Sequence, residues 1–297
     1  MRALLSAGIL AAAAAASAAA APWSVVLQPA GGTSAGEDGG SLIWIGLRNG
    51  SARARIVCGD EHVGMQVYSR PVASVRLSRY SDHECSTAWS WHLVGPQETL
   101  FFLQPLPDID RAGGAALGIS LTTQEWPALD AKRTRAIDRD ATFGHWSVVP
   151  PATAGDAEPG SWAAVVQRAR STANTRSYWL GLENRSSRPR GVCGYVAVAF
   201  SVRRGDGELR RGRDREDGPA DCREEQRRLV LPGETYHVLF ELALQPEDAA
   251  ADALIIDYGT REVSRTGAVL PRRIALRWTD TRLGSPGTGR ARAIAPP

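Results

Sequence analysis

The sequence predicts an all-β chain of two tandem antiparallel β-sandwich domains that arose by internal duplication. Three observations predict this fold: a motif that occurs twice, about seven short strands separated by turn signals in each copy, and one pair of cysteines in each copy. The motif covers residues 44–59 and again residues 179–194, an offset of 135 positions. Both copies read W-[IL]-G-L-x-N-x-S-x-x-x-R-x-V-C-G without a gap, which indicates duplication.

The repeated motif predicts a β-hairpin in each copy. In the first copy residues 41–48 alternate between two faces, so that one face can be buried and the other partly exposed. Asn49-Gly50 is a strong two-residue turn signal, and residues 53–58 return from it as a second strand. In the second copy residues 184–189 form a longer polar turn. The matched Asn and Ser are explained by turn chemistry, because their side chains bond to nearby backbone groups.

The other strands follow in order along each copy. Short β-branched or alternating runs predict strands at residues 23–28, 63–69, 100–103 and 115–122 of the first copy, and at residues 195–202, 236–242 and 253–259 of the second. Residues 203–218 mix both charge signs with four glycines and predict a solvated loop. No convincing amphipathic helix is found, which favours an antiparallel sandwich.

A second matched step supports the same architecture. Glu98-Thr99 aligns with Glu234-Thr235 at an offset of 136, and each pair leads into an apolar strand. The step Pro232-Gly233-Glu234-Thr235 resembles one that many bacterial Ig-like domains carry. This resemblance of fold implies that each sandwich is Ig-like.

These patterns divide the chain into five segments. They are a signal peptide (1–21), a first sandwich (22–125), a linker (126–160), a second sandwich (161–282) and a disordered tail rich in Gly, Pro, Ala and Arg (283–297). Residues 143–149 echo the first strand, residues 23–26. The first strand of the second domain is therefore expected anywhere from residue 141 to residue 161, either inside the linker or at Trp162.

The N-terminal segment predicts export. Arg2 precedes an uncharged apolar run over residues 3–21 with small residues at its end, which is typical of a secretory signal peptide. Cleavage is expected to leave a mature chain that starts near Ala21 or Pro22. Beyond residue 21 no stretch approaches the ~20 apolar residues of a membrane helix. The expected location is the periplasm or the cell exterior.

Export places the four cysteines in an oxidising compartment, where an even count predicts disulfides. Four cysteines allow three pairings, and the duplication selects one of them. Cys58 corresponds to Cys193 and Cys85 to Cys222, so each copy is expected to hold one disulfide, Cys58–Cys85 and Cys193–Cys222.

Composition argues against nucleic acid as a partner. The formal net charge is +3, but 32 acidic residues are mixed among the 35 basic ones, and no basic stripe with interleaved aromatic residues occurs. No cofactor is expected either, because no cofactor-binding motif is present.

The sequence also favours a non-catalytic chain. No G-x-S-x-G or S-x-x-K motif surrounds any serine, and all cysteines are assigned to disulfides. The best cluster for a metal lies beside the first disulfide and comprises His62, His83, Asp60 and Asp82. These residues are more simply polar loop residues, and a metal-assisted hydrolase is the less favoured alternative.

Tryptophans provide the other candidate site. Trp44 and Trp179 are matched and are expected to be core or disulfide-packing residues, whereas Trp89 and Trp91 share one face of a strand and are candidates for stacking on sugar rings if that face is exposed. The leading interpretation is an exported, non-catalytic binding or structural module of the bacterial cell envelope that acts on a protein partner. Carbohydrate binding through Trp89 and Trp91 is the alternative.

Overall fold

The structure is a computed structural model. It describes residues 22–33, 41–59, 62–68, 74–80, 85, 90–106, 116–127, 134–143, 162–171, 175–194, 196–213, 222–243, 248, 251–280 and 291–292. Within these residues, no helix has the length and apolar character needed to cross a membrane. The N-terminal segment expected to be a signal peptide lies outside the described residues.

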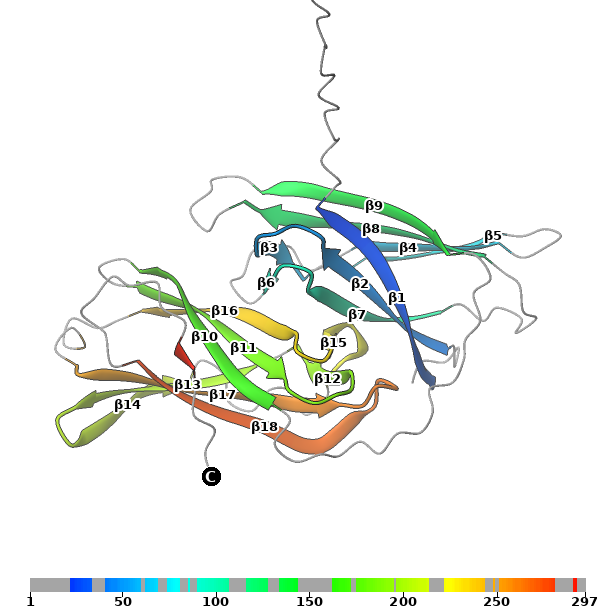
Figure 1. Cartoon of the computed structure of the whole chain (residues 1–297). Coiled ribbons are helices and arrows are strands. Elements are labelled where there is room, and N and C mark those ends of the chain that lie inside the picture. Colours follow the sequence, from blue (N-terminus) through cyan, green and yellow to red (C-terminus); the bar gives the residue numbers. More distant parts are fainter. Residues whose placement is uncertain are drawn as a thin grey trace, which may run out of the picture.

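The first repeat is a sandwich of two antiparallel sheets (Figure 1). The smaller sheet has the order β1-β2-β7, and the larger sheet joins β5-β4-β8-β3-β6 with β9 added beside β8. The strands are β1 (Trp23–Thr33), β2 (Ser41–Asn49), β3 (Arg55–Cys58), β4 (His62–Tyr68), β5 (Ser74–Tyr80), β6 (Trp91–Val94), β7 (Thr99–Pro105), β8 (Ala116–Trp126) and β9 (Arg135–Phe143).

The second repeat has the same nine strands in the same order. Its smaller sheet is β16-β11-β10, and its larger sheet joins β14-β13-β17-β12-β15 with β18 added beside β17. The strands are β10 (Trp162–Ser171), β11 (Thr175–Asn184), β12 (Arg190–Cys193), β13 (Ala197–Arg204), β14 (Gly207–Arg213), β15 (Arg227–Val230), β16 (Thr235–Ala243), β17 (Ala253–Val263) and β18 (Val269–Asp280). The 3₁₀ turn η2 (Glu224–Gln226) precedes β15. The predicted pair of duplicated sandwiches is confirmed.

Two strands lie where the sequence analysis expected a loop or a linker. The expected solvated loop at residues 203–218 contains β14, which pairs with β13 through a turn at residues 204–207. The expected linker at residues 126–160 contains β9, which pairs with β8 from Glu125↔Arg135 to Leu117↔Phe143. The larger sheet of the first repeat therefore continues to residue 143. In β9 exposed side chains alternate with less exposed ones, and most of the exposed ones are polar, so its apolar signal is weak.

The second repeat begins its sheet at Trp162. Trp162 lies opposite Asn184 just as Trp23 lies opposite Asn49, so Trp162 corresponds to Trp23. The echo at residues 143–149 was therefore misleading: Phe143 belongs to the first repeat, and residues 144–149 lie outside the described residues. Within the tail expected to be disordered, β19 (Ala291–Arg292) pairs with Val165 and Val166 of β10.

Both predicted disulfides are present. Cys58 is bonded to Cys85 and Cys193 to Cys222, with Cα–Cα distances of 5.9 and 5.8 Å. A threonine on the neighbouring strand, Thr123 or Thr260, donates a hydrogen bond to the carbonyl of each first cysteine at 2.9 or 2.8 Å. The two copies thus fix their disulfides to the larger sheet in the same way.

The motif asparagine ties two turns together in each repeat. The Asn49 side-chain amide donates to the carbonyls of Arg53 and Val94 at 2.8 and 3.0 Å, and Asn184 makes the equivalent bonds to Arg188 and Val230 at 2.8 and 2.9 Å. Both asparagines are fully buried. The structural role predicted for the matched asparagine is therefore confirmed. Each asparagine bonds to two separate turns rather than to its own turn alone.

Candidate functional site at the interface between the repeats

The two repeats contact each other in a reciprocal way. Strand β6 of the first repeat packs beside β16 of the second, and β15 of the second packs beside β7 of the first (Figure 1). Because β6 corresponds to β15 and β7 to β16, the two contacts are the same contact made twice. Part of the outer face of each smaller sheet is therefore covered by the other repeat.

Trp44 anchors one half of this interface. Its side chain is fully buried and packs in a cluster with Phe101, Leu103 and, from the other repeat, Leu229. The indole Nε1 donates a hydrogen bond to the carbonyl of Arg265 at 2.9 Å. Arg265 lies in the turn between β17 and β18, so this hairpin of the second repeat closes over the sheet of the first.

Gly267 allows the hairpin to come this close. Its φ of 92° lies in the left-handed region that favours glycine, and a Cβ atom there would lie 2.8 Å from a methyl group of Leu103. A side chain at position 267 would therefore strain the turn and push it away from Trp44.

Trp179 anchors the other half. It is buried in a cluster with Leu239 of its own repeat and with Cys58 and Trp91 of the first repeat. The Trp91 ring lies 4.9 Å from that of Trp126, centroid to centroid. Trp179 was expected to be a core or disulfide-packing residue, and it packs in the cluster of a disulfide, the one of the other copy.

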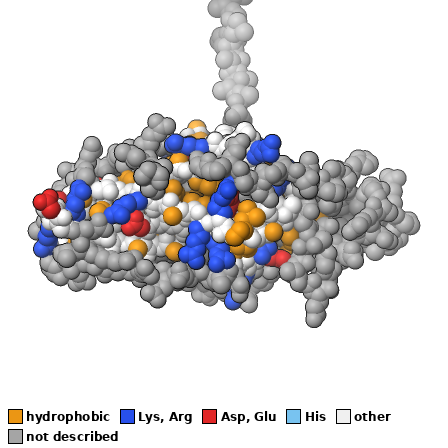
Figure 2. All heavy atoms as spheres, turned by 90° about the horizontal axis from the view of Figure 1, so that it is seen from below, with side chains coloured by type: hydrophobic (Ala, Val, Ile, Leu, Met, Phe, Trp, Pro, Cys, Tyr) orange, Lys and Arg blue, Asp and Glu red, His pale blue; other side chains and the backbone are white. Residues whose placement is uncertain are grey.

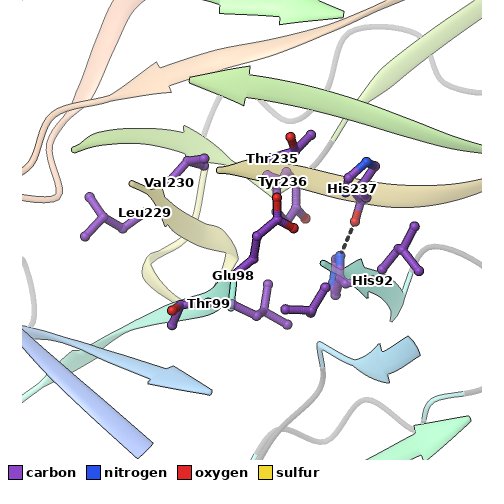
Figure 3. Close-up of a pocket in the computed structure, with 11 residues that line it drawn as sticks. His92, Glu98, Thr99, Leu229, Val230, Thr235, Tyr236 and His237 are labelled. Carbon is purple, nitrogen blue, oxygen red and sulfur yellow. Dashed lines mark hydrogen bonds between the residues drawn. The ribbon is translucent and has the colours of Figure 1, made fainter. Parts of the chain in front are cut away.

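A small cavity lies where the two contacts meet (Figure 3). It has an empty volume of about 280 Å³, part of it open to solvent. Its lining includes four matched pairs from the two repeats: Leu93 with Leu229, Val94 with Val230, Thr99 with Thr235 and Leu100 with Tyr236. Glu98 also lines the cavity, whereas its counterpart Glu234 only precedes the lining residue Thr235 in the chain. Figure 3 shows Glu98 pointing toward Thr235 and Tyr236 of β16. This cavity is the candidate functional site.

The matched glutamates Glu98 and Glu234 repel each other beside the cavity, and this repulsion affects the protonation of Glu234. Burial, and then the nearby negative charge of Glu98, raise the pKa of Glu234 to about 7. Backbone hydrogen bonds from Thr99 and Leu231 oppose this rise but do not cancel it. Glu234 therefore takes up a proton near neutral pH, which relieves its repulsion from Glu98.

His92 is held neutral at the same interface. Its Nδ1 lies 2.9 Å from the carbonyl oxygen of His237, as the dashed line in Figure 3 marks. Burial, followed by the positive charge of Arg228, lowers the pKa of His92 to about 3. The imidazole fits because Gly59 has no side chain: a Cβ atom there would lie 2.2 Å from Nε2 of His92. His92 thus acts as a neutral packing group.

Replacing Glu234 with glutamine should make the chain more stable in mild alkali and leave it unchanged in acid. The folded pKa of about 7 exceeds the ordinary 4.5, so the wild type loses stability as the pH rises from 4.5 to 7. The Glu234→Gln variant lacks this loss. Urea unfolding at pH 4.5 and pH 8 should show a gain over wild type that is about 1–3 kcal/mol larger at pH 8.

Asp206→Asn is the matched control, because Asp206 is exposed in the turn between β13 and β14. This control should show no such pH dependence. The assignment is wrong if the stability difference between Glu234→Gln and wild type is the same at both pH values.

Each repeat also buries one glutamate between two arginines. Glu125 pairs with Arg55 and Arg135, and Glu262 pairs with Arg190 and Arg272. Burial disfavours the charge of Glu125, but hydrogen bonds and positive charge from Arg135 and Arg55 outweigh it and lower its pKa. These ion triads explain why the repeated motif contains an arginine at this position. Arg55 or Arg190 points into the structure and pairs with the buried glutamate.

The structure describes some of the site residues that were predicted from the sequence and not others. Trp91 is only 4% exposed and lies in the interface cluster, so it is unavailable for stacking on a sugar, and this part of the carbohydrate alternative is corrected. Trp89 lies outside the described residues, as do Asp60, Asp82 and His83. His62 is the first residue of β4, but its side chain is not described. Within the described part of the chain, no group of three metal-ligating side chains is found.

The cavity residues were missed by the sequence analysis, although a signal was present. The Glu-Thr match at offset 136 marks Glu98 and Glu234 as equivalent, and their unequal environments arise only when the two copies meet. His92 and Arg228 are also equivalent, but their different side chains hide the relation.

Comparison with known proteins does not identify a family for this chain. No protein-family model and no curated protein matches the chain. Among solved structures, it is similar to red sea bream transglutaminase (10% identity, TM-score 0.22, over 88% of this chain and 31% of that one). It is also similar to the collagen adhesin of S. aureus (4% identity, TM-score 0.17, over 88% of this chain and 95% of that one). The chain spans about a third of the transglutaminase. Both TM-scores are too low to carry an argument, so the fold rests on the strand pairing described above.

Proposed function

We propose that the chain is an exported, non-catalytic binding or structural module of the bacterial cell envelope that acts through protein–protein contacts. One observation carries this proposal. The reciprocal interface, with Trp44 and Trp179 buried in it, fixes the two sandwiches against each other and leaves their larger sheets facing outward (Figure 1). Rigid elements that hold surfaces in fixed positions suit recognition of a partner.

Two further features support the proposal. Both disulfides suit an oxidising compartment, which agrees with the export that the N-terminal segment predicts. Three buried ionisable side chains, His92, Glu125 and Glu262, make contacts that hold strands or repeats together. Such roles are expected of a scaffold.

Capture from an envelope extract with the full mature chain as bait tests the proposal. The expected result is a protein retained in fixed ratio and lost when two exposed charges on one larger sheet are reversed, in Asp138→Arg/Asp140→Arg or in Arg273→Asp/Arg277→Asp. The matched control is Arg53→Asp/Arg188→Asp, which reverses exposed arginines in the motif turns and should retain the partner.

Two results would contradict the proposal. One is that chemical cross-linking before capture yields no specific protein. The other is that the purified chain holds a divalent metal in a one-to-one ratio and loses stability in chelator, which would favour a metal-assisted hydrolase.

A further inference from the structure

The smaller sheets of the two repeats differ at one edge. In the second repeat the edge strand β10 is covered by β19, which places Arg292 opposite Val165 and Ala291 opposite Val166. In the first repeat the corresponding strand β1 pairs with β2, and on its other side it has no strand neighbour among the residues that the structure describes (Figure 1). Of these two equivalent edges, the described chain therefore covers one.

The strand registers identify equivalent positions on the two edges. Because Trp23 corresponds to Trp162 and both strands pair without a bulge over the next four residues, Leu27 corresponds to Val166. Val166 is the residue that lies opposite Ala291 of β19. A strand that paired with Leu27 as β19 pairs with Val166 would extend the first smaller sheet in the same way.

The backbone of β1 presents hydrogen-bonding groups at this edge. The Pro22 carbonyl accepts a hydrogen bond from the Gly50 N–H at 2.7 Å, on the side of β2, whereas the Trp23 carbonyl accepts one from Nε of Arg139 at 3.0 Å. Successive residues of a strand face opposite sides, so Leu27, four residues after Trp23, turns its N–H and C=O away from β2. Within the described residues these two groups have no backbone partner.

Strand β1 also lacks most of the features that protect sheet edges. Natural edge strands are commonly shielded by charged side chains, by proline or by a covering segment. The 11 residues of β1 include no charged residue, although 23% of the chain is charged and Figure 2 shows Lys, Arg, Asp and Glu side chains spread over the face that it presents. Pro29 has no N–H and limits pairing beyond Leu27. The stretch from Val25 to Leu27 is therefore suited to accept a further strand.

We propose that the β1 edge accepts the C-terminal tail of a second copy of the chain, residues 283–297, as an added antiparallel strand. The tail contains β19, and the pairing of β19 with β10 shows that its backbone fits the equivalent edge. While the tail of one chain stays on its own β10, a tail on β1 comes from another copy, as in domain swapping. The inference rests on the proposed function, in that the chain acts through protein–protein contacts, and it names the partner as a second copy.

A synthetic peptide of residues 283–297 tests the inference with the full mature chain. The labelled peptide should bind in a fluorescence anisotropy titration, and amide hydrogen exchange at Leu27, followed by NMR, should slow because the Leu27 N–H is then hydrogen-bonded. The peptide with Ala291→Pro should bind at least about tenfold more weakly, since proline has no N–H to pair at this position. The peptide with Ser285→Ala, a change outside β19, is the matched control and should bind like the parent.

Proline at Val166 tests the exchange of tails between whole chains. Val166→Pro removes the N–H that faces β19, so the tail should leave β10 and become available to the β1 edge of a second copy. Sedimentation should then show a Kd of self-association about tenfold below that of the wild type. Adding Leu27→Pro should abolish this association, because β1 then lacks the equivalent N–H. Far-UV circular dichroism verifies that each variant is folded.

Several results would overturn the inference. They are a parent peptide that does not bind, an Ala291→Pro peptide that binds equally well, and an exchange rate that changes at Val166 instead of Leu27. A partner protein that is captured from the envelope extract and lost with Leu27→Pro, without peptide binding, would also overturn it, because the edge then accepts a foreign strand. The peptide titration contains no other protein, so its failure leaves the capture experiment to decide the proposed function independently.

Discussion

Trp44→Ala should lower the free energy of unfolding by about 3–5 kcal/mol and split unfolding into two steps. The side chain is fully buried at the interface, so its loss leaves a cavity between the repeats and removes the hydrogen bond to the Arg265 carbonyl. Coupling between the repeats should then fall, and each should unfold at its own denaturant concentration. Urea unfolding followed by tryptophan fluorescence and by far-UV circular dichroism would detect this as transitions that no longer coincide.

Trp278→Ala is the matched control. Trp278 is 5% exposed in the core of the second repeat, where its ring lies 5.5 Å from that of Tyr178, centroid to centroid. Its removal should cost a similar free energy while the transitions followed by the two probes still coincide. A Trp44→Ala variant that unfolds in one step, within about 1 kcal/mol of wild type, would show that the interface does not couple the repeats.

Glu262→Ala should destabilise the chain by about 3–5 kcal/mol. The Glu262 side chain is 1% exposed, and its carboxylate accepts a 2.6 Å hydrogen bond from Nε of Arg190, which is itself 10% exposed. Removing the carboxylate leaves the Arg190 guanidinium buried without its counter-ion. Chemical unfolding at pH 7 would measure the loss.

Two comparisons separate the buried charge from other effects. Glu183→Ala removes a more exposed ion pair with Arg185 and should cost less than about 1 kcal/mol. Replacing both partners, in Glu262→Leu/Arg190→Met, should recover much of the stability lost in Glu262→Ala, because no charge is then left buried alone. Equal losses in Glu183→Ala and Glu262→Ala would refute the importance of the triad.

The duplication made the fold and the disulfides predictable from sequence. Matched residues such as Cys58 and Cys193 identify equivalent strands, and alternation identifies which residues share a face. Alternation does not reveal what covers a face, however. One face of residues 41–48 is partly exposed, as expected, because Arg48 lies on it. Trp44 on the same face is buried, as expected, but the alternation did not indicate that Leu229 of the other repeat packs against it.

The interface was not predictable, because identical pairs such as Trp44 and Trp179 do not show that the two copies meet there, and other matched positions hold unlike residues. His92 corresponds to Arg228, and Phe101 corresponds to His237, so at these interface positions the sequence shows no match between the copies. The prediction of turns from the sequence was limited in a similar way. Gln97 adopts a φ of 64° where the second repeat has Gly233 at 76°. The first copy therefore has no glycine that would indicate this left-handed position in its sequence.

The reciprocal contact between β6–β7 and β15–β16 is the kind made by an isologous homodimer, here within one polypeptide. Covalent fusion makes such a pairing independent of protein concentration. It also removes a constraint that symmetry imposes, because in a homodimer every substitution appears on both subunits. In a fused dimer unlike residues such as Asp140 of β9 and Arg277 of β18 can occupy equivalent positions, so the two halves can change independently.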